Sequence, residues 1–136
     1  MKYLLDTDTC IHAMRLHPRV VSRLSTENPS DVWVSVIAEA ELRAGAAKSS
    51  NPSASTSQIA VLLKPLTVVD FDSRDAARYG VIRAALERGG RTIGPLDMLI
   101  AAQAAARGLV LVTDNRREFT RVPGLTVESW SGASAT

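Results

Sequence analysis

Short apolar runs alternate along this chain with longer stretches in which apolar residues recur every three or four positions. The short runs are typical of buried parallel strands, and the longer stretches are typical of helices that bury one face. The predicted strands are Tyr3–Leu5, Val32–Val34, Leu66–Val69, Val110–Val112 and, at an edge, Leu125–Val127. Because strands alternate with helices, the pattern predicts a parallel sheet that is covered on both faces.

Capping residues and a polar segment divide the helical stretches of the first half of the chain. Thr9 is expected to cap a helix that begins near Cys10, and Ser35 is expected to cap a helix that runs to about Ala47. Residues 49–57 are rich in Ser, Asn and Pro, and this composition predicts a loop.

Length and composition narrow the class of protein. The 136 residues suit one domain, which we expect to span residues 1–130, with a flexible tail at 131–136. A net charge of +2 permits a nucleic-acid partner without demanding one. The lone Cys10 cannot form an internal disulfide, and Asp6 interrupts the first apolar run too early for a signal peptide or membrane span. We therefore expect a soluble, cytoplasmic protein with no membrane partner.

Acidic residues follow two of the predicted strands. Asp6 comes directly after the first strand, and Asp114 follows the fourth strand after Thr113. The carboxyl ends of parallel strands lie at one edge of the sheet, where open α/β sheets bind their ligands. A single Asp at such a place is often only a helix cap, but two at equivalent strand ends favour a site.

Two further carboxylates lie on helices. Glu41 shares a helical face with Ile37, Ala44 and Gly45, which predicts that it faces the body of the protein. Glu39 points the other way and lies four residues before Arg43, in the order that favours an exposed ion pair. An unpaired carboxylate on a packing face costs several kcal/mol unless a cation or hydrogen-bond donors satisfy it, so Glu41 is the candidate for function.

Asp97 lies in the first turn of a helix that Gly94 and Pro95 open. The helix dipole alone would favour an acid there. Asp97 also shares its face with Ile100 and Ala101, so it is directed towards the interior or its rim. Converging acids raise one another's pKa unless a cation offsets their charge, and Mg²⁺ or Mn²⁺ prefers such oxygen ligands. The sequence therefore predicts a divalent-metal site among these acids.

Several segments together resemble the VapC family of PIN-domain toxins from bacterial toxin–antitoxin pairs. They are Leu4–Asp8 (LLDTD), Ala40–Gly45 (AELRAG), Gly94–Asp97 (GPLD) and Val112–Phe119 (VTDNRREF). The resemblance runs from Lys2 to Trp130 and implies a three-layer α/β/α PIN-like fold with a central, mainly parallel sheet. It also implies a metal-dependent endoribonuclease (a hydrolase that cleaves RNA phosphodiester bonds) using Mg²⁺ or Mn²⁺, a homodimer, and a cognate antitoxin as partner.

The resemblance carries roles onto individual residues of this chain. Asp6, Glu41 and Asp97 match the acidic positions of the family. At the fourth position, Asp114 is favoured by its charge, while Asn115 or Glu118 are the alternatives. The resemblance thus implies a catalytic set of Asp6, Glu41, Asp97 and Asp114, in which Asp6 and Asp97 are expected to be the metal ligands.

Two other functions compete with a nuclease. A phospho-acceptor receiver domain also holds Mg²⁺ at a sheet edge, but residues 49–57 contain no acid that accepts a phosphoryl group. A catalytically silent module that binds only RNA or an antitoxin is the remaining alternative. It leaves Glu41 without a reason to lie on a packing face.

Overall fold

The structure is a computed structural model that describes residues 2–132. Within this range, the strands form one sheet in the order β3-β2-β1-β4-β5, and every neighbouring pair is parallel. They are β1 (Tyr3–Leu5), β2 (Val32–Ser35), β3 (Thr67–Val69), β4 (Val110–Val112) and β5 (Thr126–Glu128). The predicted strands are confirmed to within a residue at either end, and β5 lies at an edge as expected.

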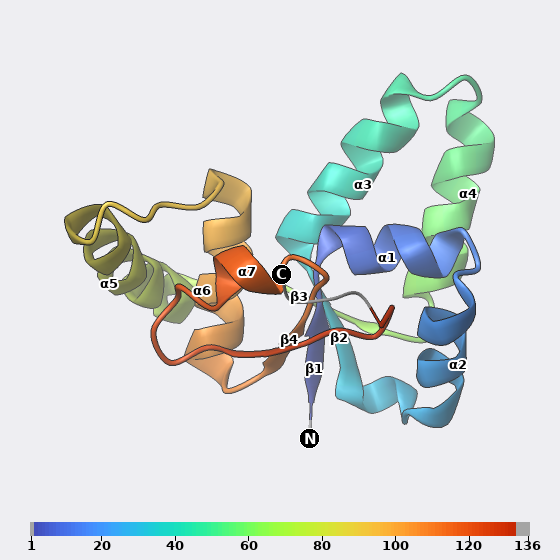
Figure 1. The fold of residues 1–136 in the computed structure, drawn as a ribbon. Helices are drawn as coiled ribbons and strands as arrows, with labels where there is room; N and C mark the ends of the chain where they lie inside the picture. The colour runs from blue at the N-terminus through green and yellow to red at the C-terminus, as the bar shows by residue number, and fades with distance from the viewer. Residues whose placement is uncertain (1, 133–136) are drawn as a thin grey trace.

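Helices cover both faces of this sheet. They are α1 (Thr7–Met14), α2 (Pro18–Thr26), α3 (Val36–Lys48), α4 (Pro52–Leu63), α5 (Ser73–Arg88), α6 (Pro95–Arg107) and α7 (Arg116–Phe119), with a 3₁₀ turn at Pro29–Asp31. In Figure 1, α1, α2 and α4 lie on one side of the strands and α5 and α6 on the other, which confirms the α/β/α arrangement. The pair α3 and α4 projects beyond the carboxyl ends of the strands (Figure 1).

The strand order places a reversal of direction beside β1. The chain passes from β1 through β2 to β3 on one side, and then returns to β4 and β5 on the other. Leu5 lies opposite Val34 of β2 and Val112 of β4, so these strands end at the same edge. Parallel sheets bind ligands beyond the carboxyl ends of the strands at such a reversal.

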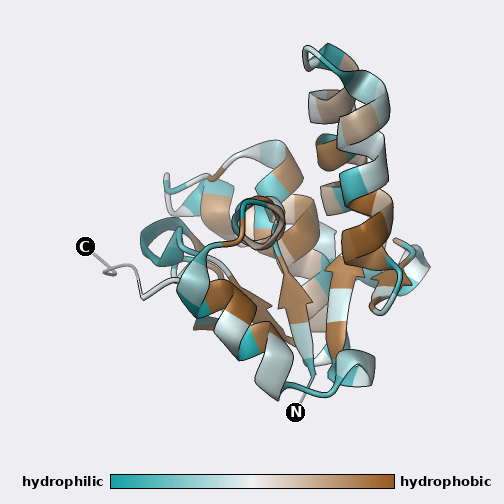
Figure 2. Ribbon diagram, turned by 90° about the vertical axis from the view of Figure 1, so that its right-hand side faces the viewer, coloured by the Kyte–Doolittle hydropathy of each residue, from teal (hydrophilic) through white to brown (hydrophobic). Residues whose placement is uncertain are grey.

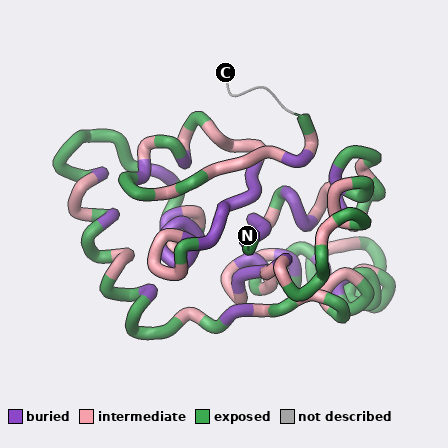
Figure 3. Tube along the Cα trace, turned by 90° about the horizontal axis from the view of Figure 1, so that it is seen from below, coloured by how far each residue is buried: buried purple, intermediate pink, exposed green. Residues whose placement is uncertain are grey.

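The central strands and α6 form most of the core. Tyr3–Leu5 and Val110–Val112 are buried along their whole length. These strands appear hydrophobic in Figure 2, and buried segments gather around them in Figure 3. On α6, Ala101 and Ala104 are fully buried, and their small side chains let the helix approach the sheet closely.

The first helix begins earlier than the sequence predicts. Asp6, and not Thr9, is its N-cap: the Asp6 carboxylate accepts a hydrogen bond of 2.9 Å from the backbone N–H of Thr9. The buried hydroxyl of Thr9 instead donates to the carbonyl of Val112 at 3.0 Å, and so joins α1 to β4. The prediction that Thr9 caps the helix is therefore wrong. Asp and Thr both cap helices well, and here the helix begins after Asp6, the earlier of the two residues.

The loop predicted at residues 49–57 is confirmed for residues 49–51 and is wrong from Pro52 onward, where the chain is helical. Asn51 caps α4 through a hydrogen bond from the N–H of Ala54, and Pro52 occupies the first helical position. The first two turns of α4 show mainly polar, exposed residues to solvent, while Ile59 is buried further along. A helix that projects from the body needs no apolar residues in its outer turns, so its sequence resembles a loop.

A buried ion pair joins α5 to α6. Asp75 is fully buried, and its carboxylate accepts two hydrogen bonds from Arg107, at 2.9 and 3.1 Å. Asp75 also accepts from the backbone N–H of Asp72, which completes a capping box at the start of α5. Gly108 then ends α6 with a φ of 65°, a left-handed conformation that glycine adopts without strain.

The tail predicted at 131–136 begins inside the described range, where Ser131 is half-buried, and residues 133–136 lie outside it. In the described part of the chain, none of the helices is both long and apolar enough to cross a membrane.

Candidate active site

Asp6 is the most central acid of the sheet edge. It directly follows β1 and is only 4% exposed. Burial raises the pKa of Asp6 from 3.8 to about 6, although hydrogen bonds from Thr113 and Thr9 act in the opposite direction and the charge of Asp8 adds to the rise. A carboxylate in this position favours a bound cation at neutral pH, because a cation offsets the cost of keeping the charge away from water.

Glu41 approaches the same edge from α3. Its carboxylate accepts a hydrogen bond of 2.7 Å from the hydroxyl of Thr7, the first residue of α1. This bond spans 34 positions of sequence and holds α3 against the start of α1. Glu39 pairs with Arg43 at 2.6 Å, so the different roles predicted for Glu39 and Glu41 agree with the contacts.

The face predicted for Glu41 needs a correction. The buried residues of α3 are Ala38, Leu42 and Ala46, whereas Ala44 and Gly45 are exposed. The reason is that α3 extends away from the sheet (Figure 1). The face on which Glu41, Ala44 and Gly45 lie therefore has no core behind it in the second half of the helix. Glu41 therefore lies half-buried at the border of the packed face.

Asp97 completes a group of mutually repelling acids. It lies in the first turn of α6 and is partly buried. Burial, followed in order of effect by the charges of Asp6, Glu41, Glu118 and Asp8, raises the pKa of Asp97 from 3.8 to about 6. Three elements from distant parts of the chain, β1, α3 and α6, thus bring Asp6, Glu41 and Asp97 within electrostatic reach of one another.

No Lys or Arg in residues 2–132 forms an ion pair with Asp6, Glu41, Asp97 or Glu118. Within the same range, no three His, Cys, Asp or Glu side chains are already gathered closely enough to hold a metal ion. The acids therefore repel one another, but they do not form a closed ligand shell for a metal ion. Such a donor set suits Mg²⁺, which usually takes one or two protein carboxylates and keeps several waters.

The last two acids of the predicted region have different surroundings. Asp114 has partners of its own: its carboxylate lies 2.9 Å from Nε2 of His12 and accepts hydrogen bonds from the hydroxyls of Ser129 and Ser131. Partial burial acts against it, but these serine hydrogen bonds and His12 lower the pKa of Asp114 below its usual value.

Glu118, on α7, is the acid whose charge reaches Asp97. Its carboxylate accepts a hydrogen bond of 3.0 Å from the side-chain amide of Asn115, whose backbone N–H bonds to the Thr113 hydroxyl at 3.0 Å. Asp114 and Glu118 are only four positions apart, and the irregular turn between β4 and α7 gives them these different partners. Helical or strand periodicity carries no signal for that choice.

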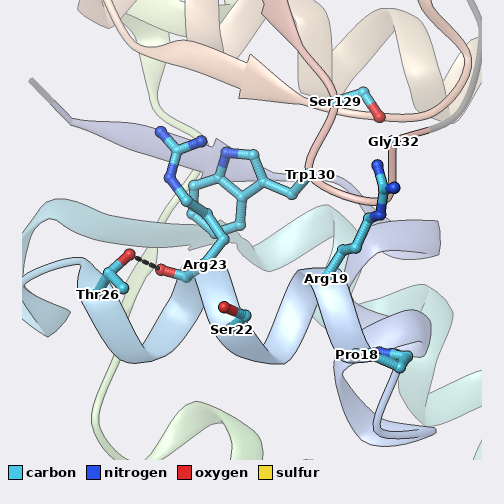
Figure 4. Close-up of a pocket in the computed structure, with 8 residues that line it drawn as sticks. All are labelled: Pro18, Arg19, Ser22, Arg23, Thr26, Ser129, Trp130 and Gly132. Atoms are coloured by element: carbon cyan, nitrogen blue, oxygen red, sulfur yellow. Dashed lines mark hydrogen bonds between the residues drawn. The ribbon is translucent and has the colours of Figure 1, made fainter.

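A hollow of about 450 Å³ lies apart from these acids, between α2 and the segment after β5 (Figure 4). The guanidinium of Arg23 lies over the ring of Trp130 at 5.0 Å. The same group pairs with Glu27 at 2.9 Å and with Glu128 at 2.8 Å. Its charge is thus already used in holding α2 to the C-terminal segment.

Known proteins match this chain over nearly its full length. The PIN domain family model matches residues 3–125. The tRNA(fMet)-specific endonuclease VapC of Salmonella typhimurium is 40% identical over 130 residues, which cover 96% of this chain and 98% of that protein. Ribonuclease VapC2 of Haemophilus influenzae is 39% identical over 130 residues, with the same coverage of 96% and 98%.

The solved structures agree with these relatives. The crystal structure of VapBC2 from Rickettsia felis, bound to a DNA fragment from its promoter, matches with a TM-score of 0.90. The identity is 36%, and the match covers 96% of this chain and 99% of that chain. Fold, family model and full-length relatives point the same way: this chain belongs to the VapC family of PIN-domain ribonucleases, the toxins of toxin–antitoxin pairs.

Proposed function

We propose that this chain hydrolyses RNA phosphodiester bonds at a Mg²⁺ site held by Asp6 and Asp97, and that Mn²⁺ can replace Mg²⁺. Nucleases with a PIN domain use divalent metal ions. The observation that carries the proposal is the group of acids with raised pKa values and no cationic partner among residues 2–132. The tRNA(fMet) specificity of the Salmonella relative makes that tRNA the first substrate to test.

A bound ion would orient and acidify a water molecule and offset the charge that develops on the phosphate. The roles of the side chains follow from their surroundings. Asp6 is held rigidly by its capping bond to the Thr9 N–H, so its position is fixed before an ion binds. Glu41, oriented by the Thr7 hydroxyl, would accept the proton of the attacking water.

For the fourth position, we propose Glu118, supported by Asn115, in place of Asp114. The charge of Glu118 acts on Asp97, and Asn115 fixes one oxygen of its carboxylate. Asp114 would then act only by holding the segment around Trp130 against α1. Glu118→Gln should lower cleavage at least 100-fold, whereas Asp114→Asn, which keeps two acceptor bonds, should lower it less than 10-fold.

The decisive experiment measures RNA cleavage with Mg²⁺, with Mn²⁺ and with EDTA, for the wild type, Asp6→Ala and Glu41→Gln. Glu39→Gln is the matched control, because it changes the neighbouring acid that pairs with Arg43. We expect cleavage only with added metal, its loss in the first two variants, and its retention in the control. Cleavage in EDTA, or full activity of Asp6→Ala, contradicts the mechanism.

Metal binding can be measured without cleavage. Calorimetric titration with Mn²⁺ should show binding to the wild type and a loss of at least 10-fold in affinity for Asp97→Asn. Equal affinity in the two proteins would place the ion elsewhere, even if the chain cleaves RNA.

We further propose that a helix of the cognate antitoxin docks in an apolar groove of about 370 Å³ between the end of α1, α2 and α4. Leu16 and Val61 line it and are 74% and 75% exposed, a large exposure for apolar residues. The antitoxin would be the small protein encoded beside this gene. Val61→Glu should weaken the complex at least 10-fold, whereas Val81→Glu, on α5 and 61% exposed, should leave it unchanged.

The homodimer implied by the resemblance stays a prediction. Light scattering of the purified chain at several concentrations tests it directly, and a mass near 14.6 kDa throughout would contradict it.

A further inference from the structure

A small pocket opens directly beside Glu41. Helices α1, α3 and α4 enclose about 270 Å³, and Ile11, Met14 and Ile59 give it an apolar lining. Glu41 lines one side, and Gly45 lies one helical turn further along α3 in the same wall. The pocket therefore continues from a carboxylate of the proposed catalytic site.

Two polar side chains of the pocket are available to contact a ligand. Arg15 follows the last residue of α1 and is exposed, and its guanidinium forms no ion pair within residues 2–132. Gln58, on α4, is likewise exposed, and its amide makes no side-chain hydrogen bond in that described range. A positive charge and an amide thus line a cavity whose walls also contain apolar side chains.

We propose that this pocket receives the base of an RNA nucleotide next to the scissile phosphate, with Arg15 on a neighbouring phosphate and Gln58 at the edge of the base. The inference rests on the function proposed above and identifies the part of the RNA substrate, a nucleotide base, that binds beside the same site. Sequence-specific recognition of RNA mostly uses unstacked bases from single-stranded regions, and arginine suits phosphate oxygens.

The size of the pocket and its neighbours favour a base over a helix of the partner. Its volume lies below the roughly 300–1,000 Å³ of pockets that take drug-sized ligands. It shares Met14 and Gln58 with the antitoxin groove, but Leu16 and Val61 do not line it. Glu41 lines this pocket and not the groove, so an occupant here is next to the proposed reacting centre.

Gly45 offers a way to fill the pocket without disturbing the fold. A Cβ added at Gly45 meets no atom within 4 Å, and the same holds at Gly80 on α5. Gly45→Met should therefore occupy the cavity, while Gly80→Met is a matched control on a helix that does not line it. Both variants should fold, which their circular dichroism spectra check.

The experiment digests a random-sequence single-stranded RNA pool with Mg²⁺ and maps the cleavage sites by sequencing. The wild type should prefer one base beside the cut, and Gly45→Met should lose that preference and cleave the preferred site at least 10-fold more slowly. Gly80→Met should match the wild type. Unchanged preference in Gly45→Met overturns the proposal, as does weakened antitoxin binding in that variant without any change in cleavage.

An abasic RNA separates a lost base contact from a general loss of activity. Removing the preferred base should slow the wild type about as much as Gly45→Met slows on the intact RNA, and the two changes together should not add. Additive losses overturn the proposal.

Arg15→Gln should raise KM and flatten the salt dependence of KM without lowering kcat, whereas Arg88→Gln should leave KM and its salt dependence unchanged. If the wild type cleaves no RNA with any metal, the proposed function itself has failed, and this outcome differs from all the others.

Discussion

Replacing Asp6 by Asn removes a charge that the folded protein holds at a cost. Burial raises the pKa of Asp6 from 3.8 to about 6. Each pKa unit corresponds to about 1.36 kcal/mol, so ionised Asp6 destabilises the metal-free fold by about 3 kcal/mol. Asn has nearly the same shape and can accept the capping bond from the Thr9 N–H, so the helix start survives the change.

The sign of the pH dependence follows from the raised pKa. Below about pH 3.8 Asp6 is protonated in both states and costs nothing. The cost grows between about pH 3.8, where Asp6 ionises in the unfolded state, and about pH 6, where it ionises in the folded state, and it is complete at pH 7.5. In EDTA, Asp6→Asn should therefore unfold at higher urea than the wild type at pH 7.5, with a melting temperature roughly 10 °C higher. At pH 4 the difference should nearly vanish.

Glu39→Gln is the control for this measurement, because the Glu39–Arg43 pair contributes less than about 1 kcal/mol at either pH. Adding Mg²⁺ at pH 7.5 should stabilise the wild type more than Asp6→Asn, since the ion binds the carboxylate of the folded state. If Asp6→Asn is no more stable than the wild type at pH 7.5 in EDTA, the buried charge is compensated in a way that the contacts do not reveal, and the reasoning is refuted.

Substitutions at three other positions have definite expectations. Arg107→Ala should cost about 3–5 kcal/mol in urea unfolding because it leaves Asp75 buried without its partner, and Arg107→Lys should restore only part of this loss. Gly108→Ala should cost about 1–2 kcal/mol because φ is 65° there, which a lower melting temperature will show. Asp114→Ala should make the segment after β5 more accessible to protease while more than a tenth of the cleavage activity remains; activity below a hundredth would return Asp114 to the site.

The sequence was informative wherever an element crosses the core. The strands, the helix that Gly94 and Pro95 open and the position of Asp6 after β1 follow from buried apolar runs and caps, because packing against the sheet leaves a periodic signal. The contrast between Glu39 and Glu41 was also predictable, since a pair four residues apart on a helix depends on local spacing alone.

The errors lie where the chain leaves the core. The outer turns of α4 are polar, so residues 49–57 resembled a loop. Ala44 and Gly45 are small but exposed, because α3 extends past the edge of the sheet. The fourth acidic position differs from these errors because it stays a prediction. Asp114 contacts His12 and the charge of Glu118 acts on Asp97, and no local pattern records either contact.

The central place of β1 has a consequence for synthesis on the ribosome. Its neighbour β4 is made more than a hundred residues later, at Val110–Val112, and Asp97 and Glu118 also come from the last third of the chain. A nascent chain that has already presented Asp6 and Glu41 therefore lacks β4, one of the two strands that pair with β1, and half of the proposed acids. The toxin should stay harmless to the ribosome that makes it until translation is almost finished, and prematurely terminated fragments should carry no nuclease activity.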